Sequence, residues 1–200
     1  MNLRTFKFPE KFAQFKGAIL FAVVLMLSNL FWKYNVLGDE SESINSTVTF
    51  WGMDISTTFT LLAQHVAHVS EKILQLLRFD ITLKPDNTLR YANGNSVVVI
   101  WSCTGLKQAY ITLFILTFAH GPWLKKLWYI PLCLLGVYAF NIFRITFIAG
   151  CMENHPHWFE FLHLYLFKYV FYGIIFLMWV YWEERIAGKG NEKQKMTEPA

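Results

Sequence analysis

The sequence predicts an all-α polytopic membrane protein with about four transmembrane helices, an outer amphipathic helix and a small extracytoplasmic β meander. The first observation behind this prediction is composition: the 200-residue chain is 54% hydrophobic and 18% aromatic but only 16% charged. A chain this apolar is atypical of soluble domains. The second observation is that four apolar segments reach or approach the length of about 20 residues that crosses a bilayer. They comprise residues 17–32, 97–119, 128–148 and 162–182.

The first apolar segment, residues 17–32, is 16 residues long and needs its flanks to complete a span. It follows a basic stretch, as the hydrophobic part of a signal peptide does. The sequence "NVLGDE" after it offers no small-x-small cleavage site. We therefore expect an uncleaved signal anchor, preceded by a basic cytoplasmic terminus at residues 1–16.

The distribution of Lys and Arg predicts the topology. Basic clusters lie at the N-terminus, at residues 125–126 and in the tail from residue 185, which are alternate loops of a chain with four spans. The positive-inside rule places all three in the cytoplasm. The loop 149–161 has no Lys or Arg and is expected outside, as is the long segment 33–96. The net charge of +4 then reflects membrane topology, and nucleic-acid binding is not predicted.

Part of the outer segment has the pattern of an amphipathic helix. In "TFTLLAQHVAHVSEKILQLLR", apolar residues recur at steps of three and four, as one face of a helix requires. We expect this helix to lie on the outer leaflet or to dock on the spans. His65 and His68 lie off the stripe and are interpreted as part of a solvated face, because no third metal ligand is evident. The stripe comprises Phe59, Leu62, Val66, Val69, Ile73 and Leu76.

Three β-prone stretches follow, and they predict a small meander of strands. These are "RFDITLK", "TLRYA" and "SVVVIW", separated by turn residues at 85–87 and 93–95. Short β-prone runs between such turns are typical of antiparallel strands. The last strand leads directly into Cys103. After the fourth span, residues 183–200 form a polar tail that is predicted to be cytoplasmic and disordered.

Polar side chains inside spans are functional candidates, because an Arg or Lys at a span centre costs roughly 2.5–3.5 kcal/mol. Arg144 lies four residues before the outer end of the third span, and Asn141 precedes it by three residues on the same helix face. His163 occupies the first turn of the fourth span, and Cys103 lies six residues into the second. A thiol, a guanidinium and an imidazole from three spans are thus predicted to reach one outer layer.

These residue types fit acyl transfer. A cysteine nucleophile needs thiolate character, which a cation or a helix N-terminus favours. An imidazole can carry the proton between thiol and leaving amine, and an arginine can hold an oxyanion. Structural interpretations stay open beside this one: Cys103 as a small hydrophobe, Arg144 reaching the outer headgroups, and His163 as an interfacial histidine. Lys107 and Lys168 either hold anions or neutralise lipid phosphates.

Three segments carry a resemblance to a known family. "CTGLKQ" at 103–108, "NIFRI" at 141–145 and "FLH" at 161–163 follow one another in three successive spans. The order, spacing and depth are similar to those of the exosortases and archaeosortases, which are multi-span cysteine transpeptidases. That family has a Cys-[Ser/Thr]-Gly-Leu motif, then Asn-x-x-Arg, then His. The resemblance covers residues 97–182 and is closest to the compact bacterial versions.

The resemblance implies a role for each catalytic candidate. Cys103 would be the nucleophile, Arg144 the activating or oxyanion-stabilising residue, and His163 the general acid and base. "LYLFKY" follows His163 where the family has small residues, so His155 and His157 are kept as alternatives. Supporting or substrate-binding roles are assigned to the remaining polar and glycine positions of the motifs. These are Gly105, Lys107, Gln108 and Asn141.

The resemblance also implies substrates and place. The substrates would be secreted proteins that end in a short motif, a transmembrane helix and a basic cluster, and the acceptor an amine on a lipid or glycan. The enzyme would lie in the bacterial inner membrane, with its active site facing the periplasm. Its membrane-embedded domain would span residues 17–182, with a motif-bearing core at 97–182, and no metal or cofactor is expected. Two alternatives stay open: a membrane cysteine protease that hydrolyses its substrate, and a non-enzymatic subunit of a secretion or polysaccharide-export system.

Overall fold

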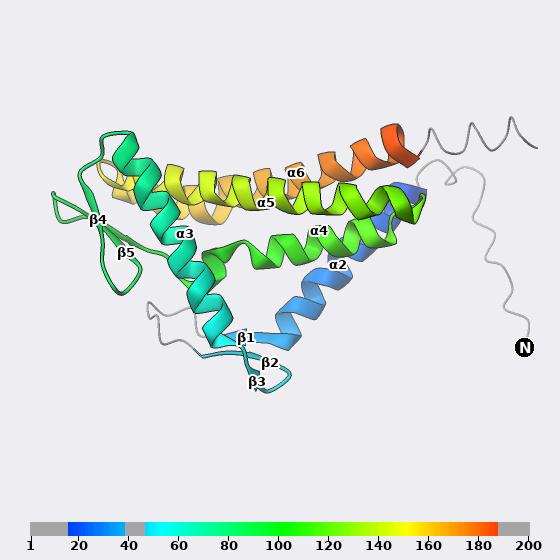
Figure 1. Ribbon diagram of the computed structural model, residues 1–200, viewed down its shortest axis with the longest axis horizontal. Coiled ribbons are helices and arrows are strands. Elements are labelled where there is room, and N and C mark those ends of the chain that lie inside the picture. The colour runs from blue at the N-terminus through cyan, green and yellow to red at the C-terminus, as the bar shows by residue number, and fades with distance from the viewer. Residues whose placement is uncertain (1–15, 39–46, 188–200) are drawn as a thin grey trace, which may run out of the picture.

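The computed structural model describes residues 16–38 and 47–187, so the predictions for the basic N-terminus and the polar tail lie almost wholly outside the described residues. Helices dominate, and α4, α5 and α6 run side by side while α2 leans against them (Figure 1). α3 crosses this bundle near one end. The prediction of a helical membrane protein is confirmed. The helices are α2 (Lys16–Asn35), α3 (Ser56–Leu76), α4 (Leu106–Phe118), α5 (Trp123–Met152) and α6 (Phe167–Tyr181).

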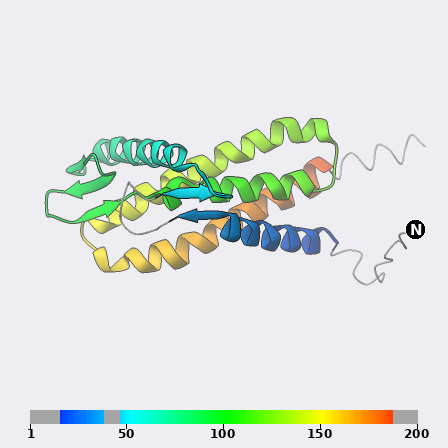
Figure 2. The ribbon, with the colours of Figure 1, turned by 90° about the horizontal axis from the view of Figure 1, so that it is seen from below.

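Short strands accompany α3. Those before it form the antiparallel sheet β1-β2-β3, and those after it form the antiparallel sheet β4-β5-β6. Figure 2 shows that the second sheet lies far from the turn between α4 and α5, toward the opposite end of the long axis. The first sheet consists of β1 (Val36–Gly38), β2 (Val48–Phe50) and β3 (Met53–Asp54). The second consists of β4 (Ile81–Leu83), β5 (Thr88–Tyr91) and β6 (Ser96–Val98).

The second sheet is the predicted meander, and its turns fall where Gly and Asn were expected to place them. Asn87 and Gly94 have φ of 56° and 92°, which are left-handed conformations that these two residue types tolerate. The first sheet was not predicted. Its strands are three, three and two residues long, too short to show an alternating pattern. The turn between β2 and β3 uses Trp51 and Gly52, both with positive φ.

The predicted second span, residues 97–119, is only partly helical, and this prediction is corrected. Its first residues belong to β6 and to the 3-10 helix η1 (Trp101–Thr104), so that α4 has 13 residues and a length of about 20 Å. The described residues contain three helices long and apolar enough to cross a membrane, namely Gly17–Asn35, Trp123–Met152 and Pro156–Ala187. An apolar run such as "SVVVIW" is compatible with either a strand or a helix, and pairing with β5 selects the strand.

The other spans are longer than predicted. α5 has 30 residues where the prediction had residues 128–148. The last span extends from the 3-10 helix η2 (Pro156–Trp158) through η3 (Phe161–Leu166), a π-helix, and α6 to η4 (Trp182–Ala187). Both spans therefore reach past the boundaries that hydropathy alone suggested.

α3 docks on the spans, which was one of the two alternatives for the amphipathic helix. Val66, Ala67 and Leu74 share one buried cluster with residues of α5 such as Ile145. Leu76, which the sequence placed on the apolar stripe, is 82% exposed, so that part of the predicted stripe is wrong. The buried face of α3 is offset from the predicted stripe and includes the small residues Ala63, Ala67 and Ser70, where α3 contacts α5. It comprises Phe59, Ala63, Val66, Ala67, Ser70 and Leu74.

Candidate functional site

Cys103 lies in η1, directly before α4, and is 5% exposed. Its backbone N–H donates to the carbonyl oxygen of Ile100 at 2.9 Å, which closes the tight turn. The hydroxyl of Thr104 donates to the carbonyl oxygen of Trp101 at 2.8 Å and accepts from Leu106 N at 3.4 Å. The thiol thus precedes the N-terminal end of a helix, an environment that favours thiolate.

Gly105 permits the turn and a close approach of α5. Its φ is +79°, a left-handed conformation that ends η1 and begins α4. A Cβ at this position would lie 2.8 Å from Cγ of Asn141. Through this approach, Asn141 Nδ2 donates to the carbonyl oxygen of Cys103 at 2.9 Å, and Asn141 is fully buried. α5 therefore holds the cysteine turn directly.

Arg144 lies one turn after Asn141 on α5 and is 7% exposed. Its Nη2 lies 3.2 Å from Nδ1 of His163, and its guanidinium is close enough to Cys103 to interact with it electrostatically. Arginine can only donate, so Nδ1 accepts and a neutral His163 carries its proton on Nε2. Three segments of the chain thus bring thiol, guanidinium and imidazole into one buried region, as the sequence predicted.

His163 belongs to the π-helix η3 and is stacked on Phe159, with ring centroids 5.1 Å apart and planes within 10°. π-helical turns are rare and frequent at functional sites. The alternative histidines lie elsewhere: His155 and His157 are exposed, with ring centroids 5.9 Å apart, and both contact Trp158. Neither takes part in the hydrogen bond with Arg144.

Several buried polar side-chain atoms make no hydrogen bond among the described residues. Five side-chain atoms of this kind occur in that part of the chain, and three belong to predicted site residues. These are Gln108 Oε1, Asn141 Oδ1 and Arg144 Nε. Each such atom costs about 1–3 kcal/mol, so a native protein retains few of them without a function.

The remaining polar candidates take no part in the contact between Arg144 and His163. Lys107 lines a cavity of about 510 Å³ between α2 and η1, together with Lys33 and with Ser102 and Thr104, which flank Cys103. Lys168 is exposed on α6. Of the two α3 histidines, His65 Nε2 lies 2.8 Å from the Tyr138 hydroxyl, and His68 lies 3.6 Å from Glu71.

Sequence reasoning missed two supports of the site. One is the stacking of Phe159 on His163; its signal was the i, i+4 spacing of the two rings on a helix. The other is Thr104, for which no role was predicted from the sequence, although its hydroxyl makes two of the hydrogen bonds of the turn.

The fold and the site together define a helical multi-pass membrane protein with a buried Cys, Arg and His cluster near one end of its bundle. Residues 43–181, most of the chain, match the family described as transmembrane exosortase, and the chain belongs to this family. The match confirms the resemblance and extends it to the outer segment, and it gives the chain a membrane exosortase-type function in general. Searches of curated proteins and of solved structures give no match.

Proposed function

We propose that this exosortase is a membrane transpeptidase that cleaves C-terminal sorting signals of secreted proteins through a thioacyl intermediate on Cys103. It then transfers the new carboxyl group to an amine acceptor. The observation that carries the proposal is the 3.2 Å contact between Arg144 Nη2 and His163 Nδ1 beside Cys103. A buried cation, a neutral imidazole and a thiol are the groups that this chemistry requires.

In the first step, the sulfur of Cys103 attacks the scissile carbonyl carbon and the carbonyl oxygen becomes an oxyanion. The Arg144 guanidinium turns from His163 to this oxyanion, because a full negative charge attracts it more strongly than a neutral ring nitrogen. Its departure uncovers the lone pair of His163 Nδ1, which takes the thiol proton. Arg144 thereby couples formation of the oxyanion to removal of the thiol proton by His163.

In the second step, the C–N bond breaks and the proton on His163 passes to the leaving amine nitrogen. The product is a thioester on Cys103. An acceptor amine attacks the thioester carbon, gives its surplus proton to His163, and forms the new amide as the sulfur leaves. The sulfur recovers the proton from His163. If water attacks in place of the amine, the enzyme is a hydrolase, which is the alternative with the same chemistry.

Asn141 and Gln108 support substrate binding in this proposal. Their buried carbonyl oxygens, Asn141 Oδ1 and Gln108 Oε1, are acceptors that backbone N–H groups of a bound peptide can use. Asn141 also fixes the cysteine turn through its Nδ2. One side chain therefore links the position of the nucleophile to the position of the substrate.

The proposed location is the bacterial inner membrane, with both termini in the cytoplasm and the site facing the periplasm. The positive-inside distribution of Lys and Arg supports this orientation. The proposed substrates are secreted proteins that end in a recognition motif, an apolar helix and a basic cluster. The proposed acceptor carries an amine on a lipid or a glycan.

The test is processing of a co-expressed secreted protein with such a tail, chosen from the same genome. Cys103→Ala is expected to abolish cleavage. The matched control is Cys133→Ala, because Cys133 is a buried thiol on α5 that lies in a different cluster, against Tyr129 and Val137. Full processing by Cys103→Ala protein would refute the proposal and favour a non-enzymatic subunit.

A second measurement separates the two chemistries. Mass spectrometry of the processed substrate distinguishes a new C-terminal carboxylate from an amide to the acceptor. A thioester trapped on Cys103 by rapid denaturation, and released by hydroxylamine, would identify the nucleophile in either case. Wild-type products that are all carboxylates would favour the protease alternative.

A further inference from the structure

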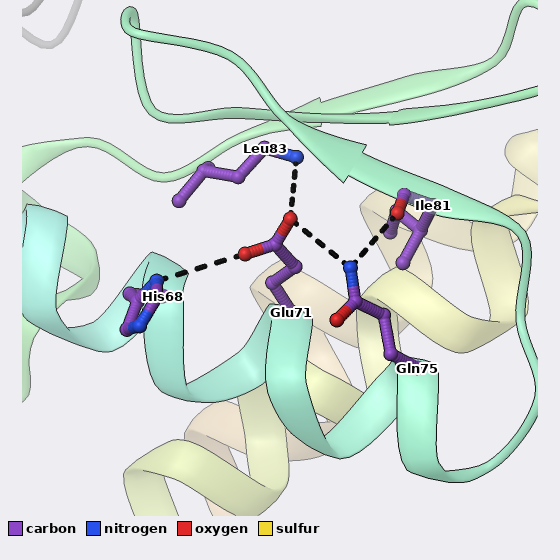
Figure 3. Close-up of polar contacts among 5 residues, drawn as sticks. All are labelled: His68, Glu71, Gln75, Ile81 and Leu83. Carbon is purple, nitrogen blue, oxygen red and sulfur yellow. Dashed lines mark hydrogen bonds and ion pairs between the residues drawn. The ribbon is translucent and has the colours of Figure 1, made fainter.

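The two edge strands of the sheet β4-β5-β6 differ, and the edge formed by β4 is closed by side chains of α3. Lys84 N donates to Thr88 O at 2.9 Å, so the alternation of antiparallel pairing turns the backbone groups of Ile81 and Leu83 away from β5. Side chains of α3 bind those groups. Glu71 Oε1 accepts from Leu83 N at 2.9 Å, and Gln75 Nε2 donates to Ile81 O at 3.3 Å (Figure 3).

The edge formed by β6 has no such cover from α3. Tyr91 N donates to Asn95 O at 2.9 Å and Val99 N donates to Asn87 O at 3.1 Å, so odd-numbered residues of this strand bond to β5. The backbone N–H and C=O of Ser96 and Val98 therefore point to the other side. Ile100 continues the extended conformation, with φ of −93° and ψ of 173°. The N–H of Ile100 therefore points away from β5, as those of Ser96 and Val98 do.

This edge borders a cavity of about 380 Å³. Ser96, Val98 and Ile100 line one side, while Met152, Pro156 and Phe159 line the other. Two of its lining residues contact residues of the proposed active site. Ile100 accepts the backbone hydrogen bond of Cys103, and Phe159 is stacked on His163.

We propose that the substrate segment next to the scissile bond binds as an extended strand along the open edge of β6. This inference rests on the proposed function of the site. Its backbone bonds to Ser96, Val98 and the N–H of Ile100, and the strand direction then leads the scissile carbonyl to Cys103. A row of alternating donors and acceptors beside an apolar wall matches the backbone of an extended peptide, whereas an acyl chain cannot use it.

One consequence concerns the substrate. A strand paired along one edge uses the backbone groups of every second residue, since the others point away. Proline lacks the N–H, so it is tolerated at alternate positions and harmful at the positions between. In a proline scan through the recognised segment of a co-expressed substrate, cleavage should be retained at every second position and lost at the positions between. A scan without this alternation would overturn strand pairing. Because the scan changes only the substrate, it does not affect the folding of the enzyme.

A second test alters the enzyme. Ser96→Pro removes one outward N–H and is expected to cleave about tenfold more slowly than Ser96→Ala, which keeps the N–H and loses only the hydroxyl. Val98→Pro should act in the same direction. Membrane abundance and alkylation of Cys103 by a maleimide are measured on each variant, so that a misfolded protein is recognised. Equal cleavage by the Ser96→Pro and Ser96→Ala proteins would overturn the proposal.

The same variants identify other occupants. If Ser96→Pro leaves cleavage intact but dissociates a detergent-solubilised dimer, the edge pairs with a second copy of the chain and the proposal is wrong. Failure of this inference is distinct from failure of the proposed function. In the first case Cys103→Ala still abolishes cleavage, whereas in the second it does not.

Discussion

Helix α5 buries one cation near each of its ends, and the two are held in different ways. Lys126, near the start, is 3% exposed, and its Nζ donates to the carbonyl oxygens of Thr117 and Ala119 at 2.7 and 2.5 Å. It also lies 4.6 Å from the centre of the Trp123 ring. Arg144, toward the other end, bonds to a ring nitrogen through Nη2, while its Nε makes no hydrogen bond with the described residues.

Under the proposed function, this difference separates a structural cation, Lys126, from a cation that binds the substrate, Arg144. Lys126 binds carbonyl groups at the C-terminal end of α4, where a helix leaves them without partners and where positive charge is favourable. Arg144 keeps a buried donor unused, which lowers stability and is retained where a bound group needs it. We expect substitutions at the first end to change stability and substitutions at the second to change activity.

The largest expected effect is that of Arg144→Gln. Loss of the proposed oxyanion partner should lower the cleavage rate by about 10²–10³-fold, the range found when one such donor is removed. Arg144→Lys should not restore activity, because an ammonium cannot replace the fork of donors. Rates are measured with a co-expressed tail-bearing substrate and normalised to membrane abundance. Wild-type rates in the Arg144→Gln protein would show that the two cations do not differ as described.

Lys126→Met is the opposite case. It leaves the carbonyl groups of Thr117 and Ala119 at the end of α4 without their donor, so we expect a loss of stability on the order of 2–4 kcal/mol. Cleavage per folded molecule should be unchanged. The measurement is the apparent melting temperature in detergent, compared with the rate normalised to folded protein. A normal melting temperature with lost cleavage would reverse the assignment of the two ends.

How far the sequence predicts this arrangement depends on the range of the interactions. The three-residue spacing of Asn141 and Arg144 placed both on one helix face, and apolar runs located the spans. The first sheet was beyond reach, because strands of two or three residues carry no pattern. The closed edge of β4 was also unpredictable, since it depends on where α3 sets Glu71 and Gln75 against backbone groups.

Gly105→Ala should show a moderate effect on the proposed active site around Cys103. The added Cβ would lie 2.8 Å from Asn141 Cγ, and a left-handed conformation costs a non-glycine residue about 1–2 kcal/mol. We expect Asn141 to lose its bond to the Cys103 carbonyl and cleavage to fall about tenfold. The control is Gly173→Ala on α6, where an added Cβ meets no atom within 4 Å. Equal rates for both variants would show that Gly105 does not position the site.

The smallest effect is expected for Tyr91→Phe, which tests a structural contact between β5 and the part of α5 that follows Arg144. The hydroxyl of Tyr91 donates to Ala149 O at 2.5 Å, so its loss should cost about 1 kcal/mol of stability and leave cleavage unchanged. Burial, together with Glu153, raises the pKa of Tyr91 above its usual value of 10.0. The neutral form is thus favoured in the folded state, and the stability that it contributes is complete below pH 10 and declines as the pH rises beyond it. The difference in melting temperature between mutant and wild type should therefore be smaller at pH 10.5 than at pH 7. A difference that grows with pH would contradict this assignment.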